Sequence, residues 1–149
     1  MMRYTVYLSG EIHSDWRDKI KKAINQNGLP IDVLTPNTDH DSSDGCATTI
    51  LGPEEKNFWT DHKSAKMNTM RHMTAIKRAD IVIVRFGDKY RQWNAAFDAG
   101  FAIANGKSLI VEHAPELTHP LKEIDACAHA VVENTEQVIE TLKYLCLDY

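Results

Sequence analysis

The run Ile81-Val82-Ile83-Val84 most constrains the fold of this chain, because it is apolar at every position. A strand with one face in water would alternate apolar and polar residues. The run therefore predicts a central strand of a parallel sheet, covered on both faces. After a polar loop, residues 94–105 have the pattern of a helix rich in alanine and glycine. Its small side chains allow that helix to lie close to the sheet.

The rest of the chain continues this alternation of strands and helices. We expect further strands over residues 5–10, 31–35, 108–113 and 130–132, and further helices over 13–27, 58–79, 121–127 and 135–145. Residues 37–56 lack periodicity and are predicted to form a long charged loop. The order predicts one α/β domain over residues 1–149. Its five-stranded parallel sheet is doubly wound and flavodoxin-like (Rossmann-like), with strand order 2-1-3-4-5 and helices on both faces.

Composition narrows the classes of partner. The 149 residues are 43% hydrophobic and carry a formal net charge of −4. No basic run is present to neutralise phosphates, and no apolar run is long enough to cross a bilayer. The three cysteines are not spaced for a disulfide framework or a zinc site. We expect a cytoplasmic protein without a nucleic-acid or membrane partner, a metal or a cofactor.

The candidate site follows from where parallel strands end. Ligands of such sheets bind at the carboxyl ends of the strands, here between the first and third. Asp98, early in the helix after the third strand, belongs to this edge. Two carboxylates in one pocket can divide roles as nucleophile and proton donor, which is the logic of glycosyl transfer. The other residues expected there are Tyr7, Ser9, Gly10, Glu11, Gly87 and Asp88.

Three short motifs lie in an order that matches a known group of enzymes. They are Tyr7-Leu8-Ser9-Gly10 in the first strand, Arg78-Ala79-Asp80 before the third strand, and Phe97-Asp98-Ala99-Gly100-Phe101-Ala102 in the helix after it. With these motifs the chain resembles the YtoQ-type family and, through it, the nucleoside 2-deoxyribosyltransferase superfamily. The resemblance covers nearly the full length of the chain.

The resemblance implies N-glycosyl transfer or hydrolysis on a (deoxy)nucleoside or a nucleoside 5′-monophosphate. Asp98 would attack the anomeric carbon, and a second base or water would resolve the glycosyl ester. Tyr7 would position Asp98, and Asp80 would contact or protonate the base. No metal is implied. The superfamily also suggests a homodimer or larger homo-oligomer, for which the methionine-rich helix over 58–79 is the candidate interface.

The chain departs from the superfamily pattern at several positions. Asp98 replaces the usual glutamate, and Gln92 stands where transferases tend to carry an acid six residues before the nucleophile. Asp88 is a candidate replacement for that acid, and Glu11 is a rival nucleophile or acid. The other candidate contacts are His13 and Asn94 for the substrate, Trp59 and Trp93 for stacking on a base or covering the core, and Ser9, Ser14 and Ser64 for a 5′-phosphate.

Two other classes compete with an enzyme. A non-catalytic nucleotide-binding module on the same fold would keep the cleft without the glutamate. A receiver or flavin protein is disfavoured, because the fifth strand ends in Glu133-Asn134 where a receiver would carry a lysine.

Overall fold

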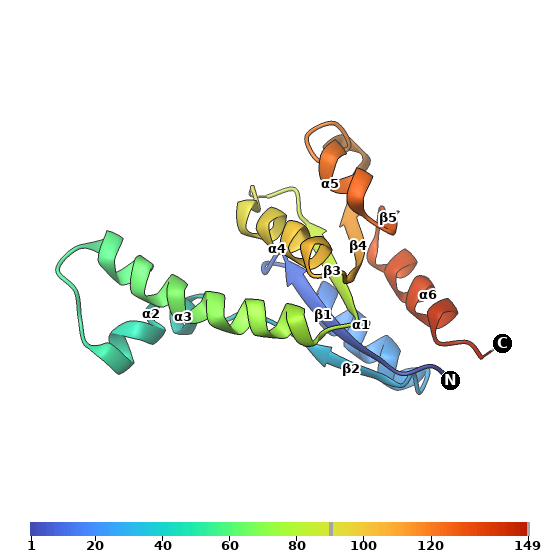
Figure 1. Cartoon of the computed structure of the whole chain (residues 1–149), viewed down its shortest axis with the longest axis horizontal. Coiled ribbons are helices and arrows are strands. Elements are labelled where there is room, and N and C mark those ends of the chain that lie inside the picture. The colour runs from blue at the N-terminus through green and yellow to red at the C-terminus, as the bar shows by residue number, and fades with distance from the viewer. Residues whose placement is uncertain (90, 149) are drawn as a thin grey trace.

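The computed structural model describes residues 1–89 and 91–148 and contains the predicted sheet. Five parallel strands lie in the order β2-β1-β3-β4-β5 (Figure 1). Their bounds are β1 Tyr4–Gly10, β2 Ile31–Leu34, β3 Ile81–Phe86, β4 Ser108–His113 and β5 Ala130–Val132. The predicted fold class and strand order are confirmed.

Helices cover both faces of this sheet. They are α1 Trp16–Gln26, α2 His40–Leu51, α3 Asn57–Arg78, α4 Trp93–Ala104, α5 Lys122–Cys127 and α6 Thr135–Leu145, with a short 3₁₀ turn at Pro115–Leu117. Within the two described ranges, no helix is both long and apolar enough to span a bilayer.

The strand β3 supplies both hydrophobic cores, as its unbroken apolar sequence predicts. Successive side chains of a strand point to opposite faces. Ile81 and Ile83 accordingly pack with residues of α1 and α6, whereas Val82 and Val84 pack with residues of α3 and α4. The buried face of α4 consists largely of Ala95, Ala99 and Ala102, so this helix lies against the sheet as expected.

The helix α2 corrects the prediction of a loop over residues 37–56. Asp39 caps it by accepting a hydrogen bond from the amide of Ser42. Its sequence has almost no apolar face, and Ala47 is its buried residue. Contacts with α3 hold it instead: Asn68 donates to the carbonyl and hydroxyl oxygens of Ser43. Tertiary contacts therefore override a weak local pattern.

The helices α2 and α3 form an arm that projects from the sheet (Figure 1). They pack on each other, and of the 22 residues of α3 only Ser64 and Ile76 are buried. The carboxyl-terminal part of α3 contacts β1 and α4, so the arm begins beside the carboxyl edge of the central strands. This placement makes the arm a wall for anything bound at that edge.

A buried arginine shapes the turn after β1, where α1 begins at Trp16 rather than at residue 13. The guanidinium of Arg17 donates to the carbonyl oxygens of Leu8, Gly10 and Glu11, at 3.1, 3.1 and 2.6 Å. It also lies 4.7 Å from the centroid of the Trp16 ring. Burial lowers the pKa of Arg17 to about 10, which still leaves it charged at neutral pH.

We expect Arg17→Met to lower the free energy of unfolding by about 2–4 kcal/mol, because it leaves buried carbonyl groups without donors. Urea unfolding of the variant measures this loss. Lys21→Met, on the exposed face of α1, is the matched control and should change stability by less than about 0.5 kcal/mol. Equal small effects of the two substitutions would contradict this role of Arg17.

Candidate active site

The carboxyl group of Asp98 lies at the carboxyl edge of the two central strands. It is only 7% exposed, although it belongs to the amino-terminal half of α4. Its Oδ2 accepts a hydrogen bond of 2.5 Å from the hydroxyl of Ser9 in β1. Because β1 and β3 pair in parallel and α4 follows β3, the topology itself brings these two residues together.

The surroundings of Asp98 favour its protonated form. Burial raises the pKa of Asp98, while the hydrogen bond from Ser9 and the charge of His72 act in the opposite direction. Burial likewise lowers the pKa of His72 from its ordinary value of 6.5, and the neighbouring Asp98 opposes that change. The two pKa values are therefore displaced toward each other. Such a pair suits proton transfer.

The hydroxyl of Tyr7 is the second unusual group at this edge. The side chain is 1% exposed, and its oxygen has no hydrogen-bond partner among the described residues. Burial raises the pKa of Tyr7 well above its usual range, and the charge of Asp98 adds to the shift. A buried polar atom without a partner costs free energy, so this hydroxyl is suited to bind a ligand.

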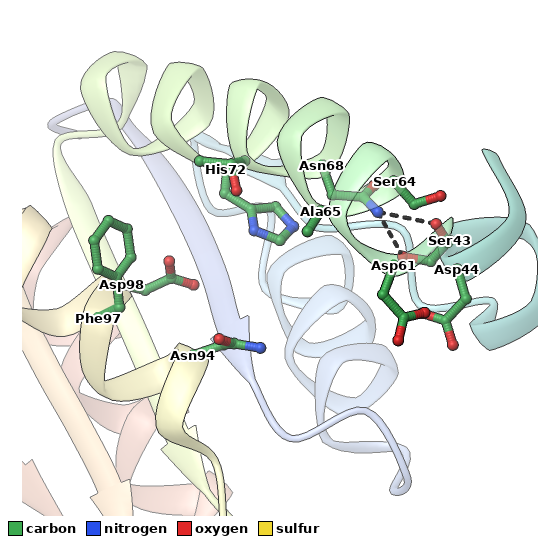
Figure 2. A pocket seen from close by; sticks show the side chains of 11 residues that line it. Ser43, Asp44, Asp61, Ser64, Ala65, Asn68, His72, Asn94, Phe97 and Asp98 are labelled. Atoms are coloured by element: carbon green, nitrogen blue, oxygen red, sulfur yellow. Dashed lines mark hydrogen bonds between the residues drawn. The ribbon is translucent and has the colours of Figure 1, made fainter. Parts of the chain in front are cut away.

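Two adjoining cavities, which we call the central cleft, surround Asp98. Their volumes are ≈ 370 and ≈ 310 Å³, and both are lined by Asp98, His72, Asn94 and Ser43. Figure 2 shows the imidazole of His72 and the carboxylate of Asp98 pointing into the first cavity from α3 and α4. An acid and a histidine thus face a space large enough for a small ligand.

The structure brings together most of the residues expected at this edge. The second cavity of the central cleft is lined by Tyr7, Ser9, Gly10, Gln92, Trp93 and Asn94 together with Asp98. Gln92 also supports the loop after β3, because its Oε1 accepts the amide hydrogen of Gly87 at 2.9 Å. Trp93 is 74% exposed, so it belongs to the wall of the cleft and not to the core.

Other expected site residues lie elsewhere. Asp80 precedes β3 at the opposite edge of the sheet, where it accepts from the amide of Thr5. Asp88 and Gly87 line another cavity, between α4 and α5, which shares Arg91, Gln92 and Trp93 with the central cleft. His13 lies in the turn between β1 and α1 and does not line the central cleft. The role of Asp80 was implied by the resemblance alone, and chain direction places Asp80 and Asp98 at opposite edges of the sheet.

Glu11, the other carboxylate considered as a nucleophile or acid, is held by several donors in the turn after β1. It is buried and accepts hydrogen bonds from the hydroxyl of Ser14 at 2.6 Å, from the amide of His13, and from Arg85 at 2.8 Å. Burial alone would raise its pKa, but these hydrogen bonds and the charge of Arg85 outweigh it, so the pKa is lowered. An acid held in this way stabilises the turn after β1.

The three serines proposed for a phosphate are also engaged. Ser9 donates to Asp98 and Ser14 to Glu11, while Ser64 accepts from the amide of Ala47. Trp59 likewise lies away from the central cleft, because it packs against Phe58 and His62 on the arm. In residues 1–89 and 91–148, no group of three or more His, Cys, Asp or Glu side chains is arranged to hold a metal ion.

Sequence reasoning missed the contribution of α3. His72, Asn68 and Asp61 line the first cavity, together with Ser43 and Asp44 from α2 (Figure 2). The signal was present in the sequence, because Asp61, Asn68 and His72 are separated by seven and four residues and so share one face of a helix. The prediction of an interface on this helix rested instead on its methionines, which lie on another face.

Comparison with known proteins identifies the family of the chain. The family model described as nucleoside 2-deoxyribosyltransferase YtoQ matches residues 7–146. The chain belongs to this family. It is 43% identical over 144 residues to a protein of Bacillus subtilis (strain 168) named "Uncharacterized protein YtoQ", and the match covers 97% of each chain. The resemblance inferred from the three motifs is thereby confirmed.

Two solved structures have the same fold. A 2-deoxyribosyltransferase from Bacillus psychrosaccharolyticus matches with a TM-score of 0.55 and 19% identity, over 93% of this chain and 95% of that one. The CMP N-glycosidase BcmB of Clostridium botulinum matches with a TM-score of 0.55 and 15% identity, over 95% of this chain and 98% of that one. At such identities the likeness establishes the fold.

We expect Asp98→Asn to stabilise the protein at neutral pH. A raised pKa means that the folded chain binds this proton more tightly than the unfolded chain. The ordinary pKa of an aspartate is 3.8. The contribution of Asp98 to the free energy of unfolding is therefore lost as the pH rises from 3.8 through the raised pKa. Asparagine still accepts from Ser9 but does not ionise. Thermal unfolding should show the gain over native protein at pH 7, and the gain should shrink toward pH 4.

The exposed Asp88→Asn controls for the removal of one negative charge. A stability gain in Asp98→Asn that is the same at both pH values, or a loss at pH 7, would show that the folded protein does not resist ionisation of Asp98.

Proposed function

We propose that the protein cleaves the N-glycosidic bond of a nucleoside or nucleotide, with Asp98 as the nucleophile. The observation that carries this proposal is the buried Asp98 facing His72 across the central cleft. Membership of the family supports the same chemistry. The transferase and the CMP N-glycosidase with the same fold give two precedents, transfer and hydrolysis.

The chemistry uses Asp98 in its ionised form. With Oδ2 held by Ser9, Oδ1 attacks the anomeric carbon of the sugar and the bond from that carbon to the base breaks. The electron pair of the bond leaves with the base, and a glycosyl ester of Asp98 remains. Attack by water then yields the free sugar, whereas attack by a second base yields a new nucleoside. In either case the carboxylate is restored.

His72 is the group that we assign to the leaving base. It lies opposite Asp98 and lines both cavities of the central cleft. A protonated imidazole can give its proton to the base as the bond breaks, which makes the base a better leaving group. Asn94 and Asn68, which line the first cavity, supply amide groups suited to hydrogen bonding with a base.

A nucleotide-binding module without catalysis is the second candidate. Two departures from the superfamily favour it. Asp98 is one methylene shorter than the usual glutamate, and a displacement of about 1 Å can cost about 100-fold in rate. Gln92 stands in place of an acid and binds the amide of Gly87. Such a module would bind a nucleotide without releasing its base.

The deciding measurement is release of free base from a panel of nucleosides and their 5′-monophosphates, followed by chromatography with and without a second base. Native protein should release or exchange base, and Asp98→Ala should lower the rate by about 10⁴-fold or more. Asp88→Asn, outside the central cleft, is the control and should retain the native rate. No release by native protein, with a ligand-induced rise in melting temperature, would favour the binding module.

The same assay tests the role of His72 through its pH dependence. Activity needs ionised Asp98 and protonated His72, so the rate should fall at low pH and again above the lowered pKa of His72. The optimum is therefore expected on the acid side of neutrality. His72→Gln should remove the fall on the alkaline side. An unchanged profile in that variant would exclude this assignment.

We also propose that copies of the chain associate through the arm. Large apolar side chains are exposed there, at 65% for Ile50, 65% for Phe58 and 64% for Met70. Exposed apolar side chains of this size favour contact with another protein surface. Sedimentation should give a dimer or larger species, which Phe58→Ser should weaken. A native chain that sediments as a monomer would contradict this.

A further inference from the structure

A third cavity, of ≈ 410 Å³, adjoins the central cleft alongside α3. We call it the arginine recess, because Arg71 and Arg78 line it together with Leu34, Thr35, Met70, Thr74 and Ala75. Tyr7 and His72 belong to its wall and also to the wall of the central cleft. The recess is therefore next to the space that Asp98 faces.

The charges of the recess are unlike those of the central cleft. Arg71 and Arg78 are exposed, and neither makes a hydrogen bond or an ion pair in the part of the chain that the structure describes. No Asp or Glu is among the described residues that line the recess. The first cavity of the central cleft is instead lined by Asp44, Asp61 and Asp98. An anion is thus attracted to one side of His72 and repelled from the other.

The spacing of the two arginines suits a phosphate. Seven residues on a helix correspond to about two turns, or roughly 10 Å along its axis. Two long side chains on one face of α3 can approach a single phosphate from both ends of that span. Guanidinium groups bind phosphate through charge-assisted hydrogen bonds.

The buried hydroxyl of Tyr7 is an independent indication of a ligand. The Tyr7 side chain lines both the recess and the central cleft, and its hydroxyl oxygen lacks a partner among the described residues. Burial and the charge of Asp98 raise the pKa of Tyr7, whereas the charges of Arg17 and Arg71 oppose that shift. The hydroxyl therefore remains a hydrogen-bond donor, within electrostatic reach of Arg71.

We propose that the arginine recess binds a phosphate group attached to the sugar whose anomeric carbon faces Asp98. The substrate is then a nucleoside monophosphate, with Tyr7 donating to the phosphate or its ester oxygen. Arg71 and Arg78 are assigned to the phosphate in place of Ser9, Ser14 and Ser64, whose hydroxyls bond Asp98, Glu11 and the amide of Ala47. The position of the sugar rests on the proposed function, but binding of the phosphate does not.

The test is calorimetric titration with ribose 5-phosphate and with ribose. Native protein should bind the phosphate ester at least about tenfold more tightly, and Arg71→Gln and Arg78→Gln should each weaken that binding by about ten- to a hundredfold. Lys77→Gln is the matched control, because the Lys77 ammonium lies over the ring of Phe101 and not in the recess. It should leave the affinity unchanged.

A second cation gives the outcome that would overturn the proposal. Arg91 lines the other side of the central cleft. If Arg91→Gln weakens binding and the recess variants do not, the phosphate lies elsewhere. Equal affinity for both sugars, or no binding of either, also overturns it. Base release by the Asp98→Asn variant is measured separately. Turnover by this variant would contradict the proposed role of Asp98 but would not contradict the phosphate site.

Discussion

The parallel pairing of β1 with β3 is the constraint on which the rest of the structure depends. At its end the two backbones come so close that a side chain at position 10 would meet the Arg85 carbonyl oxygen at 2.1 Å, so only glycine fits there. The amide of Glu11 continues the pairing by donating to that same oxygen. This pairing brings Ser9 within hydrogen-bonding distance of Asp98. Arg17 and Glu11 then fix the turn that follows β1.

The surroundings of Asp98 make its ionised form costly in free energy. A buried carboxylate loses hydration, and Ser9 restores only part of it. Glu11, which is also buried, pairs with Arg85 and accepts hydrogen bonds from two further donors, so its anionic form is stabilised. Two acids at one sheet edge therefore have opposite tendencies. Of these two acids, Asp98 has no cation bonded to it among the described residues and can therefore change its protonation or bonding state.

The sheet and its order could be predicted because they depend on patterns that are local in sequence. An apolar run such as residues 81–84 has few ways to be buried, and alternating helices leave few topologies. The grouping of Tyr7, Ser9 and Asp98 in one candidate site could be predicted, because chain direction alone places these residues of β1 and α4 at one edge of the sheet. His72 was missed because its position depends on how α3 crosses that edge. The helix α2 was missed because its stability comes from Asn68 and Ser64 on α3 and not from its own sequence.

The arm has a consequence for how this protein can vary. The side chains opposite Asp98 stand on α2 and the outer part of α3, where the only buried residues are Ala47 and Ser64. Replacing Asp44 or Asp61 therefore disturbs little packing, whereas replacing Ser9 or Asp98 alters the core of the sheet edge. Selection can thus reshape the wall opposite Asp98 without loosening the scaffold that holds Asp98. Under the proposed function, substrate preference and bond cleavage are free to evolve at different rates in one small domain.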